Sequence, residues 1–280
     1  MSIAGVTREL LVRYLDLWVP GAVHSPHGAT FLQASATELD GDVAEAALRA
    51  CAEFGDRLAR RRLTLLFVAP EVADVQRRLD AVQRELRTPP ELSLHVMPGS
   101  AAVMLKALGA HSGPLLSMID GIDPAVVAAG KPAEVLTVDV PREQLGAFEL
   151  TAAVTLVEGD HERTIGFGTR SAKNLEAFKN EMWALDEYAG VRYRDPNDPE
   201  GHLMDITLQP NPGALRRELL AFLGNGPRTV TELRRYALTE TVYRAADAVK
   251  VVTALLQGGA VTREPRDGRL GGDVTIRIAG

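Results

Sequence analysis

Short apolar runs alternate with amphipathic stretches along the first 150 residues of the chain. The run at Leu63–Ala69 is continuously apolar, as expected of a strand that other elements cover on both faces. Between such runs, apolar residues recur every three or four positions, which is typical of helices with one buried face. Strands that alternate with helices in this way predict an α/β fold with a doubly wound, Rossmann-like parallel sheet. The predicted strands are Ala29–Ser35, Leu63–Ala69, Leu92–Met97, Leu115–Ile119 and Val135–Val140.

Capping and breaking residues set the expected ends of the helices in this region. Proline lacks a backbone N–H and fits only the first turn of a helix, whereas Asp is a preferred N-cap. The predicted helices are an opening helix that Pro20 stops, a helix that Asp42 caps and that runs to about Leu58, a helix that Pro70 and Glu71 open and Pro89 stops, and Ser100–Leu108.

The pattern changes after residue 151. Two alternating runs separated by a polar stretch predict a hairpin, and a helix and a polar loop follow it. Pro210-Asn211-Pro212-Gly213 is the clearest linker in the chain, so we expect domains at residues 1–210 and 211–280. The predicted elements are strands Ala152–Val157 and Thr164–Gly168, helix Ala172–Tyr188, loop Arg192–His202 and edge strand Met204–Leu208.

The last 67 residues predict three helices and a hairpin, which is the layout of a winged-helix domain. Thr229 and Glu232 have the spacing of a capping box, and two consecutive glycines after residue 257 end the third helix. The predicted elements are helix Ala214–Leu223, a helix from Thr229, a helix from Thr239 or Glu240 to Leu256, and strands Val261–Glu264 and Val274–Ile278.

Composition indicates an ordinary globular chain, with 46% hydrophobic and 24% charged residues. No apolar run approaches the roughly 20 residues that span a bilayer, and no leader sequence is apparent. The one cysteine, Cys51, excludes an internal disulfide. We therefore expect a soluble, cytoplasmic protein without membrane contact.

Few residues have the spacing of common catalytic or metal sites. His24 and His27 are three positions apart, but no second cluster supplies the remaining ligands of a zinc ion, so no metal site is expected. The chain has no Gly-x-Ser-x-Gly elbow and no Gly-Lys-Ser/Thr phosphate loop, which argues against hydrolases and nucleotide triphosphatases.

Five segments resemble successive landmarks of the three-Cys-motif partner family. The resemblance implies a domain similar to class I methyltransferases, a winged-helix-like tail and a protein partner. The segments are RYLDLW at Arg13–Trp18, LLFVAPE at Leu65–Glu71, VMPGSAAVML at Val96–Leu105, LLSMIDGIDP at Leu115–Pro124 and FGTRSAKNLEAFKNEMWALD at Phe167–Asp186.

The resemblance implies an S-adenosylmethionine site at the carboxyl ends of the first three strands. It places Ser35 after the first strand, Glu71 near the acid that binds the ribose hydroxyls, and Gly99 and Ser100 where the family approaches the adenine. Helix-terminal roles explain Glu71 and Ser100 as well. The turn after the first strand has only one late glycine, Gly41, and so departs from the glycine-rich turn of class I methyltransferases.

Asp120 and Asp123 are the candidate catalytic residues. Asp120 ends the fourth strand, at the edge where open α/β sheets bind ligands. The family's Asp-Pro-aromatic-Gly run is replaced here by Asp-Gly-Ile-Asp-Pro, which lacks the aromatic residue and puts base methylation in doubt. Turn formation is the alternative role of both aspartates.

The net charge of −6 is unevenly distributed. Residues 211–280 carry 11 basic against 7 acidic side chains, or +4, and the rest of the chain carries −10. A basic tail indicates an anionic partner such as DNA, although a solvated mixed surface has the same composition. Packing or dimerisation through the winged helix is equally compatible with these residues. The candidate nucleic-acid-binding residues are Arg234, Arg235, Arg244, Arg263, Arg266 and Arg269.

These observations leave three functional hypotheses. The first is a methyltransferase-related partner protein with reduced or lost catalytic power. The second is an active S-adenosylmethionine-dependent methyltransferase with an unusual cofactor loop. The third is a winged-helix DNA-binding module.

Overall fold

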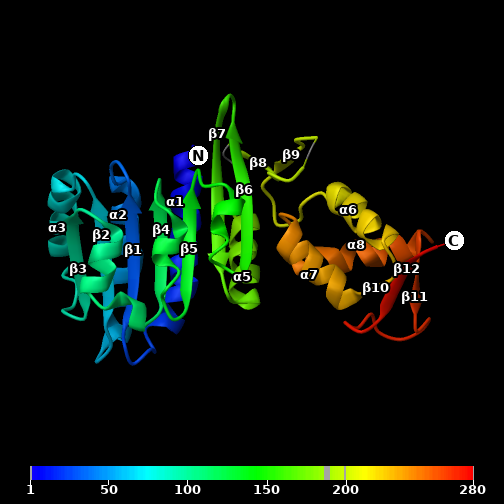
Figure 1. The fold of residues 1–280 in the computed structure, drawn as a ribbon, viewed down its shortest axis with the longest axis horizontal. Coiled ribbons are helices and arrows are strands. Elements are labelled where there is room, and N and C mark those ends of the chain that lie inside the picture. Colours follow the sequence, from blue (N-terminus) through cyan, green and yellow to red (C-terminus); the bar gives the residue numbers. More distant parts are fainter. Residues whose placement is uncertain (1, 186–189, 199, 280) are drawn as a thin grey trace.

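The computed structural model describes residues 2–185, 190–198 and 200–279, and Figure 1 shows the arrangement of its elements. In chain order the elements are α1 (Ile3–Ala22), β1 (Ala29–Ser35), α2 (Gly41–Ala52), η1 (Gly55–Leu58), β2 (Leu63–Ala69), α3 (Ala73–Leu86), β3 (Leu92–Pro98), α4 (Ala101–Ala107), η2 (Ala110–Ser112), β4 (Leu115–Asp120), η3 (Pro124–Val127), β5 (Ala133–Val138), η4 (Arg142–Leu145), β6 (Leu150–Glu158), β7 (His161–Thr169), α5 (Ala172–Trp183), β8 (Arg192–Arg194), β9 (Leu203–Asp205), α6 (Gly213–Gly224), β10 (Arg228–Thr229), α7 (Val230–Glu240), α8 (Ala245–Gln257), β11 (Val261–Glu264) and β12 (Thr275–Ile278).

The fold is α/β, built on one large and mostly parallel sheet. Its strand order is β3-β2-β1-β4-β5-β7-β6-β8-β9. Strands β1 to β5 are parallel to one another, whereas β7 runs antiparallel to both β5 and β6. The five strands predicted for the first half of the chain are all present, and the predicted hairpin forms β6 and β7. The prediction of a doubly wound, largely parallel sheet is confirmed at this level.

The predicted loop at residues 192–202 was wrong at its start. Arg192–Arg194 forms β8, which pairs antiparallel with β6 and continues the sheet. The predicted edge strand is shorter than expected: β9 covers only Leu203–Asp205 at the end of the sheet. Three-residue strands carry too few alternating positions for a sequence pattern to reveal them. The helix predicted to run to Tyr188 was too long, because α5 ends at Trp183 with Ala184 as its C-cap; residue 188 itself lies outside the described residues.

Several predicted helix ends also differ. Pro20 lies inside α1, which continues to the buried residue Ala22. The carboxylate of Asp40, rather than Asp42, caps α2 by accepting from the N–H groups of residues 42 and 43, and α2 ends at Ala52. The helix predicted to open at Pro70 begins three residues later.

The two faces of the large sheet are covered unequally. Helices α3, α2, α1 and α5 lie side by side on one face. The only regular cover that the described residues place on the opposite face is α4 and the short turns η2, η3 and η4, over a small core that includes Leu32, Leu66 and Ile119.

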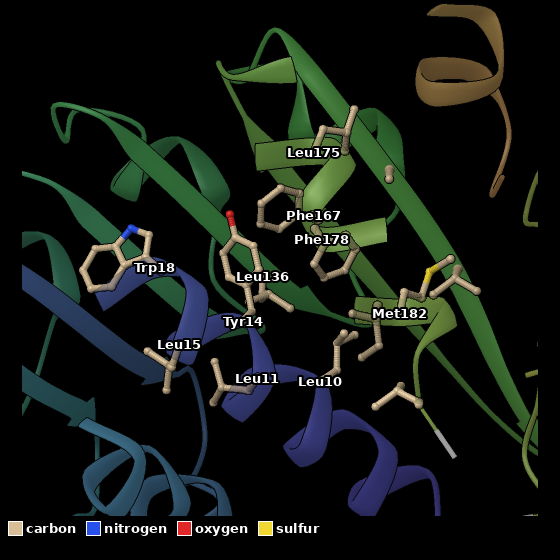
Figure 2. Close-up of a cluster of buried hydrophobic side chains, with 14 of the residues drawn as sticks. Leu10, Leu11, Tyr14, Leu15, Trp18, Leu136, Phe167, Leu175, Phe178 and Met182 are labelled. Atoms are coloured by element: carbon tan, nitrogen blue, oxygen red, sulfur yellow. The ribbon is translucent and has the colours of Figure 1, made fainter. Parts of the chain in front are cut away.

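Aromatic rings form the centre of the larger core (Figure 2). Phe167 of β7 stacks on Phe178 of α5 with ring centroids 4.3 Å apart. Tyr14 of α1 meets Phe167 edge-on at 5.1 Å, and its hydroxyl donates to the buried carboxylate of Glu134 at 2.6 Å. Asn174 also donates to Glu134, so the buried carboxylate has two donors, although burial still raises its pKa. These contacts join α1, α5 and the antiparallel part of the sheet.

The tail has three helices and a small antiparallel sheet of order β10-β12-β11. The predicted capping box is present: the Thr229 hydroxyl accepts from the N–H of Glu232, whose carboxylate accepts from the N–H of Thr229. The predicted start of the third helix was wrong, because Glu240 ends α7 and α8 begins at Ala245. The turn between these helices is stabilised by contacts outside the tail, which a local pattern does not encode.

The end of α7 and the α7–α8 turn, together residues 237–244, are held by the rest of the molecule. Lys179 of α5 is fully buried, and its Nζ donates to the carbonyl oxygens of Leu238 at 2.6 Å and Tyr243 at 3.0 Å. It also donates to the carbonyl oxygens of Ala237 and Thr241. A helix end leaves carbonyls without partners, and this amine satisfies them. Burial lowers the pKa of Lys179 to about 7, although the nearby Asp195 carboxylate opposes this shift.

Two more side chains hold the same turn. The indole N–H of Trp183 donates to the carbonyl of Val242 at 3.1 Å, and the Asp195 carboxylate accepts from the N–H of Val242 at 3.1 Å. Tyr243 stacks on Trp183 with ring centroids 5.9 Å apart. The tail is thus attached through buried, directional contacts rather than by a linker alone.

No helix among the described residues is both long and apolar enough to cross a membrane. Cys51 is fully buried on α2, and burial raises the pKa of its thiol.

Candidate functional site

The carboxyl ends of β1 and β4 bring two of the predicted site residues together. Ser35 and Asp120 are register partners at the last positions of these strands, and the N–H of Ala36 donates to the carbonyl of Asp120 at 2.9 Å. A pocket of about 40 Å³ lies at this edge. Its lining residues are Ala4, Thr7, Gln33, Ala34, Ser35, Glu38, Asp40, Val43, Met118, Ile119, Asp120, Val138 and Arg163.

The turn after β1 is closed by its own contacts. The Ser35 hydroxyl accepts from the N–H of Thr37 at 3.2 Å. Glu38 and Glu71 then form an isolated parallel bridge, which joins the turn after β1 to the segment after β2. Backbone from one turn therefore borders backbone from the other at the place where a glycine-rich turn would leave room for a ligand.

Asp120 is exposed to solvent, and the pKa of its carboxyl is shifted. Partial burial raises the pKa of its carboxyl, the nearby Arg163 opposes that shift, and Asp139 adds to it. Arg163 itself lies 3.4 Å from the Asp139 carboxylate. Asp123 has a different environment: its carboxylate accepts from the N–H of Ala125 at 2.9 Å and caps η3. Of the two candidate catalytic aspartates, only Asp120 lines the pocket.

The other predicted cofactor residues follow the neighbouring strands but do not line this pocket. Glu71 is exposed, two residues beyond the end of β2. Gly99 has φ +122°, a backbone conformation that favours glycine, and its N–H donates to the carbonyl of Ala69 at 3.1 Å. Ser100 is the exposed N-cap residue of α4, without a side-chain capping bond. Ser35 and Asp120 thus lie together, and the other three lie along the same edge.

Two lining residues were not predicted from the sequence. Gln33 is 5% exposed; its amide nitrogen donates to the carbonyl of Asp40 at 3.1 Å, while its Oε1 is buried without a partner. Arg163 reaches the pocket from β7. A glutamine in the middle of an otherwise apolar strand was the available signal for Gln33. No sequence signal indicated Arg163, because the pairing of β7 with β5 brings this residue to the pocket.

Two of the candidate tail arginines form hydrogen bonds or ion pairs within the protein, and the others are exposed. Arg244 is 9% exposed, pairs with Asp247 at 2.8 Å and donates to the carbonyl of Leu208. Arg263 donates to carbonyls of its own hairpin, including those of residues 265 and 268 at 2.9 Å. Arg266 and Arg269 are exposed on the hairpin tip.

The remaining two candidates, Arg234 and Arg235, are exposed on α7 and line a cavity of about 540 Å³ between α7 and the start of α5. Arg170, which directly follows β7, lines the same cavity, as do Glu149 and Glu176. Two candidate nucleic-acid-binding arginines thus share a cavity with a third arginine.

An acidic group lies beside the attachment of the tail. Asp198, Glu200 and His202 have ligand atoms within 4.8 Å of one another, and His202 approaches Asp198 at 2.8 Å and Glu200 at 3.2 Å. Burial and the charges of Asp195 and Asp198 raise the pKa of Glu218 to about 7. The sequence prediction overlooked this group because its members lie in a loop and on α6.

No protein-family model matches the chain, and no curated protein matches it either. Among solved structures, spermidine synthase from Thermotoga maritima is similar to 62% of this chain, with a TM-score of 0.38 and 10% sequence identity. The chain covers 64% of the length of that structure.

Proposed function

We propose that this chain is a methyltransferase-related partner protein of the three-Cys-motif partner type, with a degenerate S-adenosylmethionine site. In this proposal residues 1–210 form a methyltransferase-type scaffold, and residues 211–280 form a winged-helix domain that packs on it. The strand order β3-β2-β1-β4-β5-β7-β6, with β7 reversed, is the order of class I methyltransferases and supports the first part. A fold hosts many functions, so the role rests on the site.

The closed turn after β1 is the observation that carries the proposal. The bridge between Glu38 and Glu71 joins the turns after β1 and β2, and the pocket at this edge measures about 40 Å³. One water needs roughly 10–15 Å³ of such space, so the pocket has room for about three waters. This small volume supports a degenerate S-adenosylmethionine site, and no methyl-transfer step follows from this geometry.

The acceptor side of the edge supports the same proposal. Asp120 is followed by Gly121 and Ile122 instead of an aromatic residue that would cover a base. An added Cβ at Gly121, which has φ +64°, would lie 3.0 Å from the Cβ of Ala36, so the turns after β4 and β1 are in close contact. A planar methyl acceptor such as a base would therefore find no aromatic side chain to stack on directly after Asp120.

Calorimetric titration with S-adenosylmethionine and S-adenosylhomocysteine tests the proposal. We expect no binding at millimolar ligand and no rise in the melting temperature. A ligand at 100 times its Kd would add about 2.7 kcal/mol to the stability of the fold, which a melt detects readily.

Binding in the micromolar range would overturn the partner role and support the active methyltransferase instead. Asp120→Asn would then weaken binding or methyl transfer, while the matched variant Asp123→Asn, three residues away on a turn, would not. Equal effects of both variants would argue against a role of Asp120 in that enzyme.

DNA binding is a second candidate function, favoured by the cavity that Arg170, Arg234 and Arg235 line. The first turn of α8 does not favour it, because Arg244, Asp247 and Ala248 are buried and cannot enter a major groove without detachment of the tail.

The DNA hypothesis predicts salt-sensitive retention of duplex DNA in a mobility-shift assay. Each phosphate contact that is lost lowers the salt slope by about 1. The paired charge reversals Arg234→Glu with Arg235→Glu, and Arg266→Glu with Arg269→Glu, distinguish the cavity from the hairpin tip. Absence of retention at 50 mM salt (roughly the low end of the range in which such contacts are strong) would exclude this function.

A further inference from the structure

Three hydroxyl groups form a row across the sheet at the edge opposite the candidate cofactor site. Thr30 of β1 is the register partner of Thr64 of β2, which is the register partner of Ser93 of β3. Leu32 and Leu66, two residues further along, belong to the core under α4, so the row lies on that face of the sheet. His95 lies on the same face as Ser93, two residues further along β3, where its register partner is Leu66. Polar side chains thus interrupt an otherwise apolar face of the sheet.

The row lines a pocket of about 120 Å³ at the amino ends of β1, β2 and β3. Thr30 is 7% exposed, and Thr64 and Ser93 are half-buried, so all three side chains border the pocket. Hydroxyl groups at the border of a pocket can donate hydrogen bonds to a ligand or to water inside it. The pocket has space for more than a single water, which needs roughly 10–15 Å³.

Arg62 brings a positive charge to this pocket. His27 and His95 also line it, and the lining contains no carboxylate among the residues that the structure describes. Arg62 is the last of three consecutive arginines, Arg60 to Arg62, that lead into β2. One guanidinium nitrogen of Arg62 donates to the carbonyl of His27 at 3.3 Å, which holds the side chain over the loop before β1. The side chain thus has further donors for an anion.

Two glycines allow the backbone to form the wall of this pocket. Gly28 has φ +75°, and an added Cβ would lie 2.9 Å from the carbonyl oxygen of Arg62. An added Cβ at Gly113 would lie 2.4 Å from the carbonyl oxygen of Gly28. The loops before β1 and β4 therefore meet backbone to backbone. This contact fixes the distance between Arg62 and the hydroxyl row.

We propose that this pocket binds a phosphate group, either as inorganic phosphate or as the phosphate of a small monoester. A tetrahedral oxyanion accepts hydrogen bonds in several directions at once, so it can accept from hydroxyls on two neighbouring strands, which lie about 4.8 Å apart. A guanidinium adds two parallel charge-assisted donors. A cation would find no carboxylate here, and an apolar ligand would leave the hydroxyls without partners.

Titration of the full chain with inorganic phosphate and with methyl phosphate tests this site. We expect saturable binding by calorimetry and a rise in melting temperature that equal ionic strengths of chloride do not produce. Stronger binding of methyl phosphate would identify a monoester as the natural ligand, and weaker binding would identify the free anion. Absence of saturable binding of both at 20 mM, about 20-fold (roughly 1.8 kcal/mol) weaker than a Kd of 1 mM, would overturn the proposal.

Variants locate the binding. Arg62→Gln is expected to weaken phosphate binding at least tenfold, and Thr64→Val, which keeps the shape but removes the hydroxyl, about fivefold. Arg77→Gln on the exposed surface of α3 removes the same charge away from the pocket and serves as the matched control. Equal losses for Arg62→Gln and Arg77→Gln would mean that net charge, not this pocket, attracts the anion, and would also overturn the proposal.

Discussion

Replacing Lys179 with methionine is expected to lower the free energy of unfolding by about 3–5 kcal/mol. The amine is fully buried and donates to four carbonyl oxygens at the α7–α8 turn. Methionine has a similar length but no donor, so these carbonyls would remain buried with fewer partners, and each such loss costs about 1–3 kcal/mol. Urea denaturation followed by circular dichroism measures the change.

Lys173→Met is the matched control, because Lys173 lies on the same helix but is exposed. We expect it to change stability by less than about 0.5 kcal/mol. A loss below 1 kcal/mol for Lys179→Met would show that the turn is held by Trp183 and Asp195 without the amine.

Phe178→Ala is expected to destabilise the protein by about 3–5 kcal/mol. Its ring stacks on Phe167 at 4.3 Å and meets Tyr14 edge-on at 5.9 Å, in the core that joins α1, α5 and β7 (Figure 2). Removal of the ring leaves a cavity that neighbouring strands are too constrained to fill. Thermal and urea unfolding both report the loss.

Phe54→Ala provides the comparison. Phe54 is half-buried beneath the guanidinium of Arg57, so we expect a loss of about 1 kcal/mol. Similar losses for both variants would contradict a core centred on Phe178.

The buried strands of the sheet could be predicted from the sequence because each carries its own signal. Leu63–Ala69 has the same bounds as the structural strand β2, and Ala29–Ser35 has those of β1. Buried parallel strands must be apolar on both faces, so their pattern is local. Helix ends were predicted less well, as at Pro20 and Pro70, because tertiary packing decided whether the helix continued or began there.

The site residues show where local patterns end. Asp120 and Ser35 could be anticipated because each ends a predicted strand, and parallel strands end at the same edge. Arg163 could not, since only the pairing of β7 with β5 brings it there. The hydroxyl row depends on strand register across three strands, and Lys179 depends on a contact made 58 to 64 residues further along the chain.

The unequal covering of the sheet has a consequence for local opening. The face that packs against four helices buries most of the large core, whereas α4 and three short turns protect the other. Local unfolding costs least where few apolar contacts are broken. Exchange of amide hydrogens with solvent should therefore reach α4 and η2 first, and a molecule bound beneath them could enter and leave while the four-helix side stays folded.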